Sequence, residues 1–423
     1  MTDVSGPVGD GAKKGTGPWY KDIDATAWKS LAAAGSGWML DGMDVMLYAV
    51  ALSHIKNEFQ LTDPQSGIIF SCTLLVAAMG GGLGGLFADR FGRVRMLMVS
   101  ILIYSVFTAM TATSQSFVQL CFWRALVGLG MGGEWSAGAA LVAETWPAKH
   151  RGKGISLMQS GFAIGYIIAA VLAAFVLPRW GWRPLFIIGI APAFLTLWIR
   201  KALPEPKIWS SQDSSTRSLT GALPILTTQP YLKRALVATA CCTVLLCAYW
   251  GLFTWMPSYL SRPVELGGAG LNVTKSMWWI IATQVGAFFG YASFGFISDK
   301  FGRKPTFLLY VLGAAAVVPI YGWSAKSELT LLIVGPFMGF FGHGYFSVFG
   351  AMLAELFPSS VRATAQGVCY NAGRAASAFA PWAIGAMAGK IGLGHTLGCT
   401  SLLYIIGAGL VLLLPETKGK EIE

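Results

Sequence analysis

The sequence predicts an all-α membrane protein, with twelve transmembrane helices in two six-helix halves. The first observation is composition, because 54% of the 423 residues are apolar, only 12% are charged, and the mean hydropathy is +0.58. A soluble domain carries about 25% charged residues. The second is a series of twelve long apolar stretches, and the third is a pair of motifs that recurs once along the chain.

Each apolar stretch is long enough to cross a bilayer, since a spanning helix needs about 20 residues. The twelve spans are expected near 30–54, 66–88, 96–114, 117–144, 154–177, 183–201, 235–260, 276–298, 305–323, 329–355, 363–388 and 396–414. A polar stretch separates the sixth span from the seventh. The chain therefore divides into an N-terminal tail (1–29), a first half (30–202), a linker (203–233), a second half (234–414) and a C-terminal tail (415–423).

The basic residues predict the orientation, because cytoplasmic loops of membrane proteins are enriched in Lys and Arg. With the N-terminus inside, 22 of the 31 basic residues are cytoplasmic, and both termini are cytoplasmic. Seven lie outside: Lys56, Arg179, Arg183, Arg262, Lys275, Lys326 and Lys390. The net charge of +11 is thus divided among short loops, so we expect no nucleic-acid partner. The remaining two, Arg124 and Arg374, lie inside spans.

Other classes of protein find little support. Residues 1–26 are polar and do not resemble a cleavable signal peptide. The seven cysteines lie almost entirely in apolar spans, which predicts packing residues and no disulfide framework. We find no metal cluster, nucleophile elbow or phosphate loop, so we expect neither an enzyme nor a cofactor or metal.

Two motifs recur along the chain. "GLFADRFGRVR" (Gly85–Arg95) follows span two, and "GFISDKFGRKP" (Gly295–Pro305) follows span eight, 210 residues later. "AETWPAKHRG" (Ala143–Gly152) closes span four, and "AELFPSSVRA" (Ala354–Ala363) closes span ten, 211 residues later. Two independent motifs at nearly one offset indicate a duplication. Because six spans return the chain to its starting side, the two halves are expected to be parallel repeats.

The Asp–Arg–x–Gly–Arg loop of the first half, repeated in the second half with Lys300 in place of the first arginine, resembles the major facilitator superfamily on its six-plus-six frame. Three stretches are similar to its carboxylate:proton symporter branch, which includes sialate, lactate and aromatic acid permeases. They are "DGMD" in span one, "RALVGLGMGGEW" (Arg124–Trp135) in span four and "PETKG" (Pro415–Gly419). The span-four text is most similar to sialate permeases, although the chain lacks the two extra central helices that some of those contain.

The charged residues of the repeated motifs are expected to meet at the cytoplasmic ends of the helices. There they would form ion pairs that hold the helices in one state, as the resemblance implies, or act only as topology signals. The expected cytoplasmic gate comprises Asp89, Arg93, Glu144, Arg151, Asp299, Arg303, Glu355 and Arg362.

Four ionisable residues in the first half are candidates for proton coupling. Asp41 and Asp44 lie three residues apart and therefore project from one side of a helix. Two close carboxylates in a poorly solvated site cannot both ionise cheaply, so one is expected to exchange a proton near neutral pH. Arg124 would control that exchange, as the resemblance implies, or form a packing ion pair. Glu134 could be a second proton site or an ion-pair partner.

Arg374 is the candidate site for a substrate anion. It lies in the middle of span eleven, and the residue 211 positions earlier is Ala163, so the charge breaks the repeat. A guanidinium group pairs with a carboxylate through two parallel hydrogen bonds. Asn371 and Tyr370 are expected to line this site. His343 is a further candidate, although a buried histidine is more often a packing residue.

These features predict a secondary active transporter that imports an organic monocarboxylate with protons by alternating access. The substrate types considered are sialic acid, lactate, aromatic acids and sugar acids. The alternative is a proton-coupled exporter, or a carrier of neutral sugars or drugs. A receptor or channel is disfavoured by the duplicated loops. We expect a monomer in the plasma membrane, the inner membrane of a bacterium, whose partners are the lipid bilayer, protons and a small organic anion.

Overall fold

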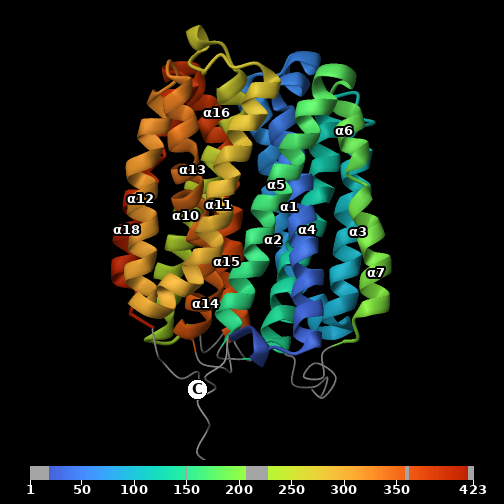
Figure 1. Ribbon diagram of the computed structural model, residues 1–423, viewed down its shortest axis with the longest axis vertical. Helices are drawn as coiled ribbons and strands as arrows, with labels where there is room; N and C mark the ends of the chain where they lie inside the picture. Colours follow the sequence, from blue (N-terminus) through green and yellow to red (C-terminus); the bar gives the residue numbers. More distant parts are fainter. Residues whose placement is uncertain (1–18, 148–149, 206–226, 358–361, 418–423) are drawn as a thin grey trace, which may run out of the picture.

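The computed structural model describes residues 19–147, 150–205, 227–357 and 362–417. Every regular element in that part of the chain is a helix, and the long helices run side by side along the longest axis (Figure 1). Most of the predicted linker, residues 206–226, lies outside the described residues, as do 1–18, 148–149, 358–361 and 418–423. The side chains of Asp89 and Arg362 also lie outside the description.

The first helix group comprises α1 to α7. After a short 3-10 helix, η1 (Trp19–Asp22), the elements are α1 (Ala25–Phe59), α2 (Asp63–Phe91), α3 (Arg93–Thr111), α4 (Phe117–Thr145), α5 (Arg151–Trp180), α6 (Trp182–Ile188), η3 (Ala191–Phe194) and α7 (Leu195–Ala202). Polar side chains cap the starts of several of these helices. For example, the Asp24 carboxylate accepts a hydrogen bond from the Ala27 amide at 2.6 Å.

The second helix group comprises α10 to α18. Its elements are α10 (Tyr231–Ser261), η6 (Val264–Leu266), α11 (Val273–Phe301), α12 (Arg303–Trp323), α13 (Glu328–Gly344), α14 (Phe346–Leu356), α15 (Arg362–Ser377), α16 (Phe379–Ile391), α17 (Leu393–Cys399) and α18 (Ser401–Leu413). All twelve predicted spans fall on helices. Four of them are interrupted: the sixth around Pro192, which lacks an amide donor, and the tenth, eleventh and twelfth at Tyr345, Ala378 and Thr400.

Ten helical stretches of the described chain are long and apolar enough to cross a membrane. The two predicted spans missing from that set are the first, α1, and the eleventh, α15 with α16. Their lower apolar content has a specific cause, because α1 carries Asp41 and Asp44 while α15 carries Asn371 and Arg374. Three of the five buried charges of the candidate site therefore lie on these two spans, and the other two, Arg124 and Glu134, lie on α4.

Glycines set the closest approaches between helices within each group. A Cβ atom placed on Gly132 of α4 would lie 2.0 Å from the Ala77 carbonyl oxygen of α2. In the second group, a Cβ on Gly339 of α13 would lie 1.9 Å from the Thr283 carbonyl oxygen of α11. Small residues permit this approach, which maximises van der Waals contact where lipid removes the hydrophobic driving force.

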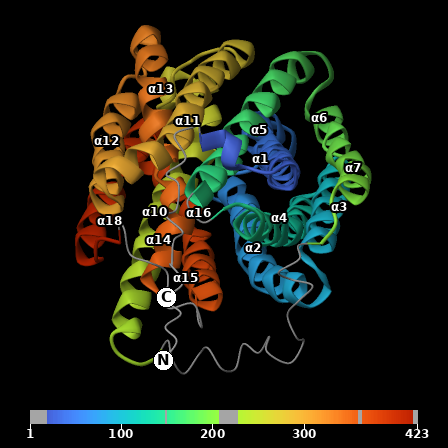
Figure 2. The same ribbon diagram turned by 60° about the horizontal axis from the view of Figure 1, so that its bottom comes forward.

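The two helix groups face one another through a few helices. Helix α5 packs against α11, and α2 packs against α15 and α16, with the first group on one side and the second on the other (Figure 2). We call the end where α2 finishes at Phe91 and α11 finishes at Phe301 the motif end. At the opposite end, the hydroxyls of Ser53 and Ser261 are hydrogen-bonded at 3.1 Å across the two groups.

Candidate functional site

Five charged side chains are almost completely removed from solvent within the described chain. Asp41, Asp44, Arg124, Glu134 and Arg374 are each at most 1% exposed. Four come from α1 and α4 of the first group, and Arg374 comes from α15 of the second. Burying so much charge in a membrane protein is costly unless the charges compensate one another or serve transport.

Asp44 and Arg124 lie together inside the first group. Arg124 donates hydrogen bonds from its two terminal nitrogens to the backbone carbonyls of Asp44 and Val45, each at 3.4 Å. Its guanidinium carbon also lies 5.7 Å from the centre of the Tyr48 ring, a cation–π distance. A Cβ on Gly189 would lie 3.2 Å from Asp44 Oδ1, so this carboxylate faces the break after α6. The structure thus places Arg124 beside Asp44, and its control of proton exchange stays a prediction.

Glu134 approaches α1 one turn before Asp41. A Cβ on Gly37 would lie 2.7 Å from Glu134 Oε1, so the carboxylate of Glu134 lies directly against this turn of α1. The Tyr104 hydroxyl donates to the Gly37 carbonyl at 3.3 Å and packs beside the same turn. Neither carboxylate oxygen of Glu134, Asp41 or Asp44 has a hydrogen-bond partner among the described residues.

Arg374 lies at the boundary between the two groups. Its guanidinium carbon is 5.5 Å from the centre of the Tyr370 ring, and that ring stacks on Trp135 of α4 with centroids 4.4 Å apart. None of its three side-chain nitrogens has a hydrogen-bond partner within the described chain. Its positive charge nevertheless acts on both Asp41 and Glu134. The second half contributes no buried acid among the described residues, so the opposing charge comes from the first group.

Two other predicted substrate-binding residues, Asn371 and His343, form their described hydrogen bonds with residues other than Arg374. Asn371 donates to the Gly367 carbonyl at 3.0 Å, and its Oδ1 lies against Gly81 of α2. His343 is fully buried, and its Nδ1 lies 3.2 Å from the Gly339 carbonyl oxygen. Its ring contacts are Tyr249, Phe253 and Tyr291, within the second group. Among the described contacts, none joins His343 to Arg374.

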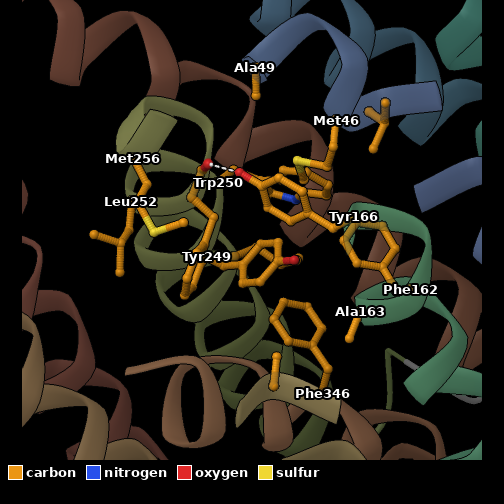
Figure 3. Packing of buried hydrophobic residues seen from close by; sticks show 14 of the residues in the cluster. Met46, Ala49, Phe162, Ala163, Tyr166, Tyr249, Trp250, Leu252, Met256 and Phe346 are labelled. Atoms are coloured by element: carbon orange, nitrogen blue, oxygen red, sulfur yellow. Dashed lines mark hydrogen bonds between the residues drawn. The ribbon is translucent and has the colours of Figure 1, made fainter. Parts of the chain in front are cut away.

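An aromatic cluster between the groups was not predicted as part of the site. Phe162 of α5 lies near Tyr249 and Trp250 of α10, and Tyr249 contacts Phe346 of α14 (Figure 3). The Tyr166 hydroxyl donates to the Phe253 carbonyl at 3.3 Å across the same boundary. The hydroxyl of Tyr249 and the indole nitrogen of Trp250 are buried without partners in the described chain. The boundary is therefore apolar with a few unpaired donors, as small-molecule sites usually are.

The repeated motifs bring their charges together at the motif end. Arg93 Nη2 lies 3.0 Å from Glu144 Oε1, and Arg303 Nε lies 3.5 Å from Glu355 Oε1. Arg303 also pairs with Asp299 at 2.6 Å. Of the other predicted gate residues, Arg151 begins α5 and its Nε has no described partner. The side chains of Asp89 and Arg362 are outside the described residues.

Two acidic residues at the motif end were not predicted from the sequence. The Glu205 carboxylate accepts hydrogen bonds from the amides of Val94 and Arg95, both at 3.1 Å. The Glu416 carboxylate likewise accepts hydrogen bonds from the backbone amides of Arg303 and Lys304, both at 3.0 Å. The signal was present, because "LPE" occurs at 203–205 and again at 414–416, which is the 211-residue offset of the other repeat.

A family profile decides the classification. The profile described as Major Facilitator Superfamily matches residues 35–271, more than half of the chain. The chain belongs to the major facilitator superfamily. A second profile, described as Sugar (and other) transporter, matches residues 214–423. The family resemblance noted from the loop motifs is therefore confirmed.

Relatives within the major facilitator superfamily align over nearly the whole chain. A cis,cis-muconate transport protein of Acinetobacter baylyi is 34% identical over 388 residues, covering 89% of this chain and 92% of the relative. A sialic acid transporter of Escherichia coli is 30% identical over 399 residues, covering 94% and 95%. The xylose transporter of Escherichia coli, solved in a partially occluded inward-open conformation, superimposes with a TM-score of 0.75. It covers 94% of this chain and 100% of its own at 21% identity, which shows the fold.

Proposed function

We propose that this protein is a proton-coupled symporter of organic monocarboxylates that works by alternating access of its two helix groups. The observation that carries the proposal is Arg374, a guanidinium group 1% exposed, with all three nitrogens unpaired in the described chain. A buried cation with free donors is suited to a carboxylate, which can accept two parallel hydrogen bonds. The sialic acid transporter among the relatives supports a monocarboxylate, because sialic acid carries one carboxyl group. The cis,cis-muconate transport protein, whose named substrate carries two, supports the wider class of organic acids.

Proton coupling rests on the acids that share this environment. Asp41 and Glu134 are fully enclosed, lack hydrogen bonds to described residues, and experience the charge of Arg374 from the other group. A proton on one of these acids would weaken its electrostatic attraction to Arg374 and leave the guanidinium group available for substrate. The same proton would compensate the charge that the substrate brings into the membrane.

Alternating access is the motion that this arrangement favours. The groups touch at the Ser53–Ser261 contact, on one side of the buried charges, and at the Trp135–Tyr370 stack. Opening one end at a time would expose Arg374 to one side of the membrane. We place the motif end and both termini in the cytoplasm, because basic residues concentrate there, and we place a monomer in a bacterial inner membrane.

Purified protein in proteoliposomes tests the proposal. A thermal-shift screen with the monocarboxylates sialic acid, lactate, benzoate and gluconate first finds an acid that stabilises the folded state. The dicarboxylate cis,cis-muconate and the neutral sugar xylose are the comparisons. Uptake of that acid should then exceed equilibrium when the lumen is alkaline, and a protonophore should abolish the accumulation. Stabilisation by xylose alone would favour a carrier of neutral sugars, and uptake indifferent to the pH gradient would refute proton coupling.

A further inference from the structure

The two aspartates of α1 lie in different surroundings although they share one helix face. Asp44 faces Gly189, and Arg124 donates a hydrogen bond to the backbone carbonyl of Asp44. Both of these neighbours belong to the first group. Asp41 experiences the charge of Arg374 as well as that of Arg124. Arg374 acts on Asp41 and Glu134 from the second group, the group that must move relative to α1 during transport.

Asp41 and Glu134 converge on one turn of α1. Glu134 lies against Gly37, which is four residues before Asp41 and therefore on the same face. The titratable and charged groups that face this pair come from three further helices and from α1 itself. They are Asp44 on α1, Tyr104 on α3, Arg124 on α4, and Tyr370 and Arg374 on α15. The tyrosines are uncharged near neutral pH, since a phenol ionises only around pH 10.

The charge balance of the enclosed site can therefore be counted. Asp41, Asp44 and Glu134 supply three negative charges, and Arg124 and Arg374 supply two positive charges, so the ionised set carries −1. No other Asp, Glu, Lys or Arg in the described chain is as deeply buried. Because a net charge enclosed in a membrane is strongly disfavoured, the empty site should hold one proton. A bound monocarboxylate then adds another negative charge and requires a second proton.

On the basis of the symport proposed above, we propose that each monocarboxylate crosses with one transported proton, electroneutrally, and that Asp41 and Glu134, the two acids within reach of the charge of Arg374, are the acids that exchange it. The substrate carboxylate binds the guanidinium group and neutralises its positive charge, so the acid that is then least compensated takes up the proton. Asp44 stays with Arg124 inside the first group and does not exchange. When the site opens to the other side, substrate and proton leave together and Arg374 returns to the acids.

Proteoliposomes with a clamped membrane potential test this assignment, using whichever of sialic acid, lactate, benzoate or gluconate the protein binds. For the unaltered protein, a tenfold proton gradient should support about tenfold accumulation, and a potassium–valinomycin potential alone should drive none. Potential-driven accumulation by the unaltered protein would overturn the one-to-one balance while leaving proton symport intact. Failure of all four acids to bind or cross would instead refute the proposed function.

The double variant Asp41→Asn/Glu134→Gln leaves Asp44 to balance two arginines. It should still exchange labelled for unlabelled acid, which shows that it is folded, but its uptake should follow the membrane potential and ignore the pH gradient. Asp44→Asn removes the third enclosed acid, and its uptake, whatever its rate, should still depend on the pH gradient and not on the membrane potential. Loss of proton dependence in Asp44→Asn, or its retention in the double variant, would overturn the assignment.

Discussion

Asp63 and Arg262 form an ion pair between the two helix groups, with Asp63 Oδ1 and Arg262 Nη2 2.6 Å apart. Asp63 is the first residue of α2, and Arg262 follows the last residue of α10. Lys56, at the end of α1, binds the same carboxylate oxygen. Asp63 therefore keeps one cation from its own group even when the groups separate, which lowers the cost of opening this end.

Arg262→Gln should favour opening of this end. The side chains of the pair are 11% and 14% exposed, and a pair of this kind contributes about 1 kcal/mol, or roughly a fivefold shift in population. Maleimide labelling of a cysteine placed at Ser53 should therefore become several-fold faster. Lys275→Gln is the control, because Lys275 pairs with Glu328 inside the second group. Equal labelling of the two variants would contradict a closing role for Arg262.

A reversible cross-link between Ser53 and Ser261 should stop transport. Their hydroxyl oxygens lie 3.1 Å apart, so paired cysteines at these positions are close enough to form a disulfide. Oxidation of the double cysteine variant should abolish uptake, and a reducing agent should restore it. The two single cysteine variants, treated identically, control for the seven native cysteines. Full uptake by the oxidised double variant would mean that this end does not open during the cycle.

Gly132→Ala should destabilise the protein, whereas Gly82→Ala should not. The added methyl group at Gly132 would meet the Ala77 carbonyl oxygen at 2.0 Å, and overpacking of this kind costs about 1–3 kcal/mol. Nothing lies within 4 Å of the same atom at Gly82, where alanine favours the helix by up to about 1 kcal/mol. Melting temperatures in detergent measure both changes. A normal melting temperature for Gly132→Ala would show that α2 and α4 can separate without cost.

Arg374→Ala should weaken binding of the substrate acid by about 30-fold or more. Removing one partner of a buried charged pair costs about 2–5 kcal/mol, and each 1.4 kcal/mol is tenfold. Arg374→Lys should recover only part of the affinity, because an ammonium group cannot form the planar fork. Calorimetry with the acid and with its amide measures this. Unchanged affinity in Arg374→Ala, or a preference for the amide, would show that Arg374 is structural.

Asp299→Asn and Glu355→Gln should slow turnover with little change in affinity. Both acids bind Arg303 at the motif end, and neither touches the enclosed charges among the described contacts. Their loss removes contacts that hold one state, so the interconversion rate changes while Arg374 remains intact. Transport rates and equilibrium binding on the same preparations separate the two effects. A large loss of affinity at an unchanged rate would contradict the gate assignment.

The sequence predicted the helices well because a bilayer imposes one length and one composition on each span. It also predicted that Arg93 and Glu144 would meet, since both follow helix ends on one side of the membrane. That the charge of Arg374 would reach Asp41 and Glu134 could not be predicted. It depends on which faces of α1, α4 and α15 turn toward one another, and apolar periodicity is weak in helices surrounded by lipid and protein.

Of the features that the sequence analysis did not predict, the roles of Glu205 and Glu416 could have been recognised from the sequence, whereas the helix break at Tyr345 could not. Glu205 and Glu416 stand at the same 211-residue offset as the other repeat, so a comparison of the halves beyond the two motifs would have paired them. The interruption of the tenth span at Tyr345 has no such marker, because the proline of that span, Pro336, lies inside the continuous helix α13. Tyr345 lies among aromatic rings from three other positions in the second group, Phe307, Phe349 and Tyr404, which only the folded structure brings together.

Glu205 also bears on how the chain assembles as it is synthesised. Its amide partners lie 110 and 111 residues earlier, on the first turn of α3, so the bond closes the first helix group upon itself. All the partners it needs have already left the ribosome when residue 205 emerges. The first group can thus form these hydrogen bonds in the membrane before α10 is synthesised, and Glu416 later forms the equivalent bonds within the second group. Because each set of bonds lies within one group, none of them has to break when the two groups move apart.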